Sequence, residues 1–160
     1  MRIYILRHAI AEDSAIGGDT KRALTEEGRK KMRDAAAGFA RLDPSIDLIY
    51  SSPLVRAVET AEIVARAIQY PRKVETLEEL SPGYTPESVA QKLKSIKKAE
   101  GIILSGHEPN CGQLASFLIG KGSFEFKKGA MCLIETESYS HGSGILIWHL
   151  PPQVLRLMKK

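Results

Sequence analysis

The sequence predicts a three-layer α/β/α sandwich, a single domain over residues 1–160 with a mainly parallel central sheet. Short apolar and β-branched runs alternate with longer segments of helical periodicity, which is typical of α/β domains. A chain of 160 residues with 43% hydrophobic and 26% charged residues is suited to one packed core. With two cysteines and 13 glycines, the composition excludes collagen-like, disulfide-stapled and strongly disordered chains.

The first strand and helix have clear signals. Ile3–Leu6 is an apolar run that predicts a buried strand. After a polar loop, Thr25 is suited to cap a helix, because its hydroxyl can accept a backbone hydrogen bond and acidic residues follow in the first turn. Asp43-Pro44 should end this helix near Leu42, since the residue before a proline avoids helical geometry.

A second strand and helix follow in the same order. The strand is predicted at Asp47–Tyr50, and Ser51-Ser52-Pro53 is expected to cap a helix over about residues 53–68. Five apolar residues fall largely on one side of that helix: Val55, Val58, Ile63, Val64 and Ala67. A brief strand near Val74 comes next, and the Ser81-Pro82-Gly83 turn then breaks the chain.

The second half repeats the alternation and ends in two strands. Its predicted elements are a helix over 86–98, a strand over 101–104, a helix over 110–119 capped by Asn110, strands over 131–135 and 144–149, and a short helix after Pro152.

Charge and the first residues narrow the expected partners. The 23 Lys and Arg against 19 Asp and Glu give a net charge of +4, but the cations are spread along the chain and aromatics are only 6%, so no nucleic-acid partner is expected. The opening MRIYILRHA is too short an apolar run for a signal peptide or membrane span, and Cys111 and Cys132 are expected as reduced, buried thiols. These features predict a cytoplasmic protein without a membrane partner.

Cations and histidines follow three predicted strands. They are Arg7-His8 after the first strand, Arg56 after the second, and Gly106-His107 after the strand over 101–104. Because ligands of open α/β sheets bind outside the carboxyl ends of the strands, we expect these loops to converge. Guanidinium groups match phosphate oxygens in bidentate geometry and stay charged, so a phosphate dianion is the predicted ligand. The chain carries neither a P-loop nor an aspartate cluster for magnesium, so no metal or other cofactor is expected.

This residue set suits phosphoryl transfer. A neutral imidazole can attack phosphorus and form a phosphohistidine that water then hydrolyses, while arginines stabilise the equatorial oxygens. The residues alone leave open whether His8 or His107 is the nucleophile, and Glu79 is a candidate proton donor. Asn110 is expected first as a helix cap and second as a phosphate contact through its backbone amide.

Three motifs resemble the histidine phosphatase (phosphoglycerate mutase-like) superfamily. They are Leu6-Arg7-His8-Ala9, Ser51-Ser52-Pro53 through Arg56-Ala57-x-Glu59-Thr60-Ala61, and Ser105-Gly106-His107. The short length and two further phrases most resemble the small SixA-type phosphohistidine phosphatases: Arg22-x-Leu24-Thr25-x-x-Gly28 and Leu77-x-Glu79-Leu80. The resemblance covers nearly the whole chain, to about residue 150.

The resemblance implies a role for each position. It makes His8 the phosphorylated nucleophile, clamped by Arg7 and Arg56, with His107 stabilising the transfer. It also makes Arg22 an additional phosphate or substrate contact, and it places Glu79 at the position of the acid in other branches of the superfamily. One departure is Ala9, where the family usually has glycine: alanine disfavours positive φ but keeps a carbonyl that can orient the imidazole.

The resemblance also suggests a substrate. The chain has little room for a lid between Leu80 and Gly101, so an open site suited to phosphohistidine on a protein, for example a histidine phosphotransfer domain, is expected. Imidazole is a better leaving group than an alkoxide and needs little acid assistance. Two alternatives remain at this stage: a small-molecule phosphomonoesterase or mutase acting on a phosphorylated metabolite, and a non-catalytic phospho-ligand-binding module.

Overall fold

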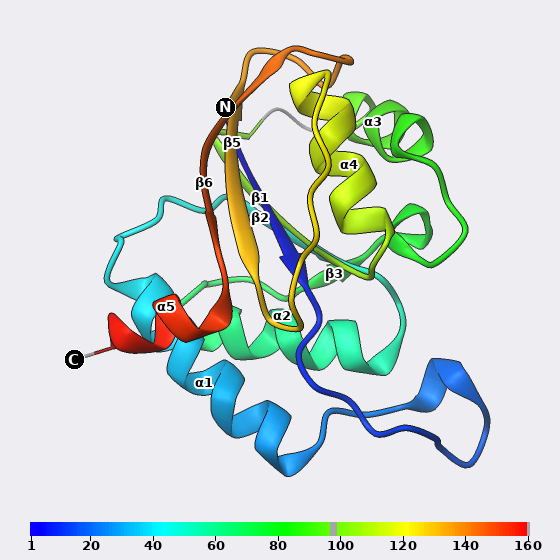
Figure 1. Ribbon diagram of the computed structural model, residues 1–160, viewed down its shortest axis with the longest axis vertical. Helices are drawn as coiled ribbons and strands as arrows, with labels where there is room; N and C mark the ends of the chain where they lie inside the picture. The colour runs from blue at the N-terminus through cyan, green and yellow to red at the C-terminus, as the bar shows by residue number, and fades with distance from the viewer. Residues whose placement is uncertain (97–98, 160) are drawn as a thin grey trace.

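The computed structural model describes residues 1–96 and 99–159 (Figure 1). Its strands are β1 (Arg2–Arg7), β2 (Leu48–Ser51), β3 (Glu75–Thr76), β4 (Gly101–Gly106), β5 (Met131–Thr136) and β6 (Gly144–Leu150). Its helices are α1 (Glu26–Ala40), α2 (Val55–Ala67), α3 (Pro86–Lys94), α4 (Asn110–Ile119) and α5 (Pro152–Leu157), with 3-10 turns η1 (Asp19–Lys21) and η2 (Glu78–Leu80). None of these described helices is long and apolar enough to cross a membrane.

The six strands form one sheet in the order β3-β2-β4-β1-β5-β6. The first four strands in that order are parallel, while β5 and β6 add antiparallel pairs at the far edge, which confirms the mainly parallel sheet. The register places Arg7 opposite Gly106 and Ser51 opposite Ser105. The tips of β1, β4 and β2 therefore end level with one another.

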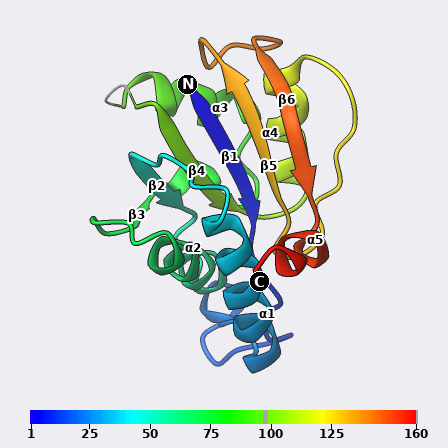
Figure 2. The same cartoon turned by 90° about the vertical axis from the view of Figure 1, so that its left-hand side faces the viewer.

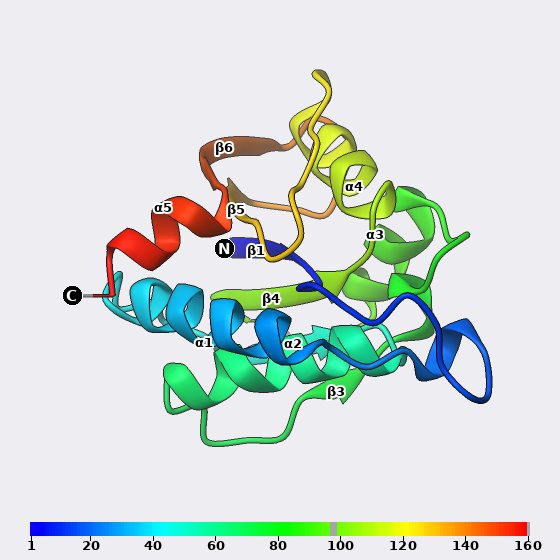
Figure 3. The ribbon, with the colours of Figure 1, turned by 60° about the horizontal axis from the view of Figure 1, so that its bottom comes forward.

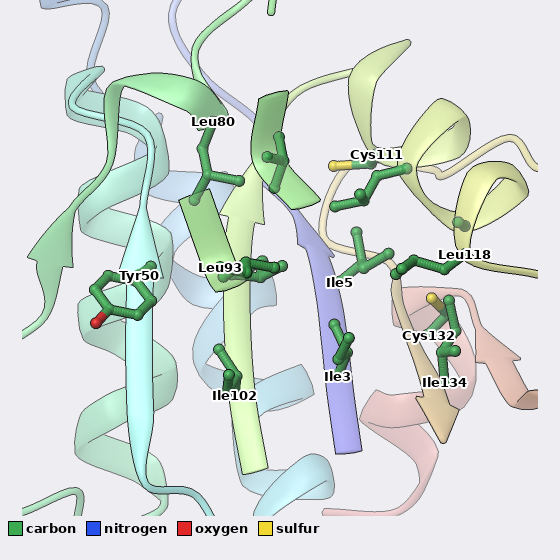
Figure 4. Packing of buried hydrophobic residues seen from close by; sticks show 14 of the residues in the cluster. Ile3, Ile5, Tyr50, Leu80, Leu93, Ile102, Cys111, Leu118, Cys132 and Ile134 are labelled. Atoms are coloured by element: carbon green, nitrogen blue, oxygen red, sulfur yellow. The ribbon is translucent and has the colours of Figure 1, made fainter. Parts of the chain in front are cut away.

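Helices cover both faces of the sheet (Figure 2), as the α/β/α prediction requires. Successive side chains of a strand point to opposite faces. Ile3 and Ile5 of β1 pack with α3 and α4 (Figure 4), whereas Tyr4 and Leu6 pack on the side of α1, α2 and α5. Cys111 and Cys132 are both buried free thiols, as expected.

Helix α1 holds the loop that follows β1. The Thr25 hydroxyl accepts a hydrogen bond from the Gly28 amide at 2.9 Å, which confirms the predicted cap. The Thr25 amide donates to the Ile10 carbonyl at 3.0 Å, and a Cβ at Gly28 would lie 2.0 Å from that same oxygen. Only glycine lets the helix approach the loop so closely.

The predicted cap of α2 is wrong, and its predicted buried side is only partly confirmed. The helix begins at Val55, and no side chain caps it. Of the five residues predicted on its buried side, Ile63 and Val64 are buried, whereas Val55, Val58 and Ala67 are only half-buried. The buried face also includes Ala57 and Ala61, whose small side chains let the helix lie close to the sheet.

Two other predicted helix ends also change. Asn110 does not cap α4 but is its first residue, and the carboxylate of Glu108 accepts the hydrogen bond of the Gly112 amide at 3.0 Å instead. Helix α3 ends at Lys94, and its predicted end at Lys98 lies outside the described residues.

Candidate active site

The predicted convergence of three loops at the carboxyl ends of the strands is present. The ring centroids of His8 and His107, which follow β1 and β4, are 5.1 Å apart with their planes inclined by 54°. Ser52, which follows β2, places its Oγ 2.9 Å from Nε2 of His107. Both histidines are buried, with His8 7% and His107 2% exposed. The parallel register thus brings residues far apart in sequence into one cluster.

The His8 ring is oriented by the backbone. Its Nδ1 lies 2.7 Å from the Ala9 carbonyl oxygen, and because a carbonyl only accepts, Nδ1 carries the proton and Nε2 keeps a lone pair. The Ala9 amide donates to Oγ1 of Thr60 at 3.0 Å, and that hydroxyl donates to the Arg56 carbonyl at 2.7 Å. Ala9 is not among the positive-φ residues, so alanine fits here without strain. The carbonyl thus orients the imidazole as expected.

The His107 ring is held from the other nitrogen. Ser52 Oγ accepts from the Leu54 amide at 3.3 Å, so its own hydrogen is available to Nε2 of His107. A hydroxyl can donate to Nε2 or accept from it, and we assign the proton of His107 to Nδ1, which is buried and has no hydrogen-bond partner among the described residues. Two neighbouring imidazoles thus present opposite characters, a lone pair on one and an N–H on the other.

Both histidines are uncharged at neutral pH. Burial, with the nearby charges of Arg56, Arg7 and Lys128, lowers the pKa of His8 to about 4. Burial, with His8 and Arg56, lowers the pKa of His107 to about 3. Neutral imidazole is the form that can act as a nucleophile.

Arg56 and Arg7 lie beside these rings. Arg56, 5% exposed in the first turn of α2, donates from Nη1 to the Asp19 carbonyl at 2.8 Å and from Nη2 to the Asp19 carboxylate at 3.0 Å. Arg7 donates from Nη1 to the Phe126 carbonyl. The Nε atoms of both arginines are buried without a partner. Glu59, three residues further along α2, pairs with Arg29 at 2.9 Å and not with Arg56.

The unpartnered atoms concentrate in this cluster. Among the described residues, five buried side-chain polar atoms have no hydrogen-bond partner, and three of them are Arg7 Nε, Arg56 Nε and His107 Nδ1. Buried donors are nearly always satisfied in folded proteins, so such a group calls for an explanation. An oxyanion bound among these neighbouring residues would accept hydrogen bonds from the three donors.

Arg22 joins the site only through Asp19. Its Nη1 donates to Oδ1 of Asp19 at 2.7 Å, while Nε donates to the Glu12 carbonyl. Hydrogen bonds from Arg22 and Arg56 lower the pKa of Asp19. Asp19 was not predicted as a site residue. It is held at the start of η1, after two positive-φ glycines, Gly17 and Gly18.

Glu79 and Asn110 lie on the other flank of His107. Glu79, His107 and Asn110 line a cavity of about 20 Å³ between α3 and α4, and Tyr84 lines it too. The Asn110 side chain donates to the Tyr84 carbonyl at 2.6 Å, so it ties down the loop before α3. Glu79 is half-buried and shares this cavity with His107.

Ser52 and Thr60 were also missed as functional residues, although both stand inside the motifs that carry the family resemblance. Their hydroxyls fix the His107 ring and the Ala9 loop respectively. His141 and His149, in contrast, pack against phenylalanine rings away from the cluster, His141 on Phe117 and His149 on Phe126. The part of the chain that the structure describes contains no group of three or more His, Cys, Asp or Glu side chains arranged to hold a metal.

The mainly parallel sheet, with helices on both faces, defines an α/β protein of the phosphoglycerate mutase-like fold, and two neutral histidines and two arginines gather at the carboxyl ends of its strands. The model of the histidine phosphatase superfamily (branch 1) matches residues 3–99. The chain belongs to this superfamily, and its membership supports phosphatase activity.

Similar proteins agree with this assignment. The chain is 26% identical to the phosphohistidine phosphatase SixA of Escherichia coli strain K12 over 162 residues, covering 99% of both chains. It is 32% identical over 118 residues to an uncharacterized protein of Picosynechococcus, covering 72% of this chain and 71% of that one. The solved structure of the protein histidine phosphatase SixA complexed with tungstate superimposes with a TM-score of 0.88 at 26% identity, covering 97% of this chain and 99% of that chain.

Proposed function

We propose that this protein removes phosphate from phosphohistidine side chains of other proteins, through a phosphorylated His8 and without a metal ion. The observation that carries the proposal is the group of three unpartnered buried atoms, on Arg7, Arg56 and His107, beside the neutral His8 ring. The similarity to SixA, solved with the oxyanion tungstate, supports a phosphate ligand at this cluster.

The first half-reaction transfers the phosphoryl group to His8. Its Nε2 lone pair forms a bond to phosphorus while the bond from phosphorus to the substrate imidazole nitrogen breaks, and the leaving nitrogen takes the electron pair and a proton from solvent water. Hydrogen bonds from Arg7, Arg56 and His107 stabilise the equatorial oxygens. The hydrogen bond from Nδ1 to the Ala9 carbonyl keeps Nε2 aimed at phosphorus and stabilises the imidazole as its charge grows.

The second half-reaction returns the enzyme to its starting state. Water attacks phosphorus as the bond to Nε2 of His8 breaks, and inorganic phosphate leaves. The guanidinium groups remain charged throughout and supply the positive charge that a metal would otherwise provide. Asp19 acts as a positioning residue, because it accepts hydrogen bonds from both Nη atoms of Arg56 and leaves Nε to bind the phosphoryl group.

A second candidate is hydrolysis of small phosphomonoesters. It is favoured by Glu79, which lines the cavity beside His107 and could protonate an alkoxide leaving group. In that case Glu79→Gln lowers turnover of a phosphomonoester strongly. If phosphohistidine is the substrate, the same variant changes turnover of a phosphohistidine peptide by less than about tenfold, since imidazole leaves readily.

The proposal is tested by acid-sensitive labelling. The purified chain is mixed with a ³²P-phosphohistidine peptide, and with a panel of phosphomonoesters, in the presence and absence of EDTA. We expect rapid phosphate release from the peptide, transient label on His8 and no effect of EDTA. Faster turnover of a phosphomonoester contradicts the protein substrate, and loss of rate that a divalent cation restores contradicts the metal-free mechanism. Saturable tungstate binding without any phosphate release would indicate a binding module.

A further inference from the structure

A basic groove begins at the tip of β1, beside the nucleophile loop. It has a volume of about 420 Å³ and lies between α1, α5 and the segment that joins α4 to β5. Figure 3 looks at this end of the molecule, where α1 and α5 lie on one side of β1 and the segment before β5 passes beside it. Arg7 and Ala9, which flank His8, line the inner end of the groove.

Positive charge dominates the lining. Its cations come from every segment that forms the groove: Arg7, Lys31, Lys127, Lys128 and Arg156. Among the described residues that line the groove, Glu125 is the only carboxylate, and it pairs with Lys127 at 3.1 Å. Lys31 pairs with Glu27 outside the lining. Lys128 and Arg156 form no ion pair within residues 1–96 and 99–159.

The groove is joined rigidly to the catalytic loop. The Gly129 amide donates to the carbonyls of Arg7 at 3.2 Å and His8 at 3.1 Å, so Lys128 stands one residue from a direct contact with the nucleophile. Gly129 has φ of 82°, and a Cβ there would lie 3.5 Å from Met32 and 3.6 Å from Pro152. The charge of Lys128 also contributes to the lowered pKa of His8, so the field of the groove reaches the reacting imidazole.

We propose that this groove binds an acidic segment of the phosphorylated substrate protein, next to its phosphohistidine. The inference rests on the proposed function and adds the chemistry that selects the partner. Carboxylates complement the ammonium and guanidinium groups of the groove, and the hydrogen bonds of the Gly129 amide hold the segment that carries Lys128 against the backbone of Arg7 and His8. No aromatic residue lines the groove, so the stacking surface that single-stranded nucleic acid uses is missing from its lining.

The test uses two matched double variants. The groove variant carries Lys128→Gln and Arg156→Gln. The control carries Arg66→Gln and Lys73→Gln, two exposed cations on the last turn of α2 and before β3, at the opposite edge of the sheet. Both variants lose two positive charges, so a general effect of net charge affects them equally.

Binding is measured by fluorescence anisotropy with peptides that carry a stable triazole analogue of phosphohistidine. One peptide has Asp and Glu around the analogue, and a second has Asn and Gln at the same positions. We expect the acidic peptide to bind the wild type about tenfold more tightly than the neutral peptide at about 50 mM salt, and the preference to shrink at about 300 mM. The groove variant should lose the preference, and the control should keep it.

The groove proposal is overturned by either of two binding results or by a competition result. The binding results are equal binding of the two peptides by the wild type, and equal loss in the groove and control variants. The competition result is displacement of the acidic peptide by a single-stranded oligonucleotide at equal or lower concentration, which would make the groove a general polyanion surface. Turnover of a phosphohistidine peptide is measured separately. If it is absent while the binding preference holds, the proposed phosphatase reaction fails and the groove assignment stands.

Discussion

His8 and His107 occupy equivalent places in the fold but have opposite hydrogen-bonding patterns. Each follows the last residue of a parallel strand, and the two strands are neighbours in register. A backbone carbonyl holds Nδ1 of His8, whereas a serine hydroxyl holds Nε2 of His107. The difference teaches that a carbonyl partner fixes which ring nitrogen of a buried imidazole carries the proton, whereas a hydroxyl partner accommodates either tautomer.

The strongest way to break this comparison is His8→Asn. Loss of the Nε2 lone pair should lower phosphohistidine turnover by at least about 10⁴-fold and abolish the acid-labile phosphoenzyme. The measurement is single-turnover labelling, with His141→Asn as an exposed histidine control. A labelled enzyme in the His8 variant would move the nucleophile to His107 and reverse the two roles.

His107→Asn should lower the turnover rate less than His8→Asn does. Removing one preorganised donor to a phosphoryl oxygen typically costs about 10²- to 10³-fold in rate. Phosphoenzyme should still form, slowly, on His8, because the Ala9 carbonyl continues to orient that ring. Complete absence of label in this variant, with the fold intact by circular dichroism, would show that His107 does more than stabilise charge.

The smallest catalytic effects are expected at the two hydroxyls that position the rings. Ser52→Ala removes the hydrogen bond to His107, and Thr60→Val removes the one to the Ala9 amide. A neutral hydrogen bond contributes about 1 kcal/mol, so each change should lower kcat about five- to tenfold with KM nearly unchanged. Ser88→Ala, in an exposed capping turn, is the control and should leave kcat unaltered. A change in KM alone would place either hydroxyl in substrate binding.

The two histidines should also make the free energy of unfolding depend on pH, each over its own pH range. Each folded pKa lies below the usual value of 6.5, so the unfolded chain takes up protons first as pH falls. The free energy of unfolding should therefore drop between pH 6.5 and about 4 for His8, and between pH 6.5 and about 3 for His107. Urea unfolding is measured for the wild type and for His8→Asn across this pH range. The free energy of unfolding lost on acidification should be smaller in the variant, by at most a few kcal/mol. Equal losses would contradict a buried neutral His8.

The strands and the residues at their tips could be predicted from the sequence because apolar runs that end in Arg-His or Gly-His are local signals. It did not show that Arg22 acts through Asp19, since that contact needs the η1 turn to fold back against α2. The same holds for Asn110, whose side chain finds a carbonyl in a separate loop. Long-range pairings of polar side chains leave no period in the sequence, and only the packed fold selects them.

The position of β4 in the sheet has a consequence for synthesis of the protein. This strand lies between β1 and β2, so the tips bearing His8 and Ser52 have no common neighbour until it is inserted. A ribosome that has released only the first two strands and their helices exposes a nascent chain without the central strand and without His107. Activity should therefore begin abruptly, once β4 and the later segment that binds Arg7 and His8 through Phe126 and Gly129 have emerged from the exit tunnel, instead of growing with chain length.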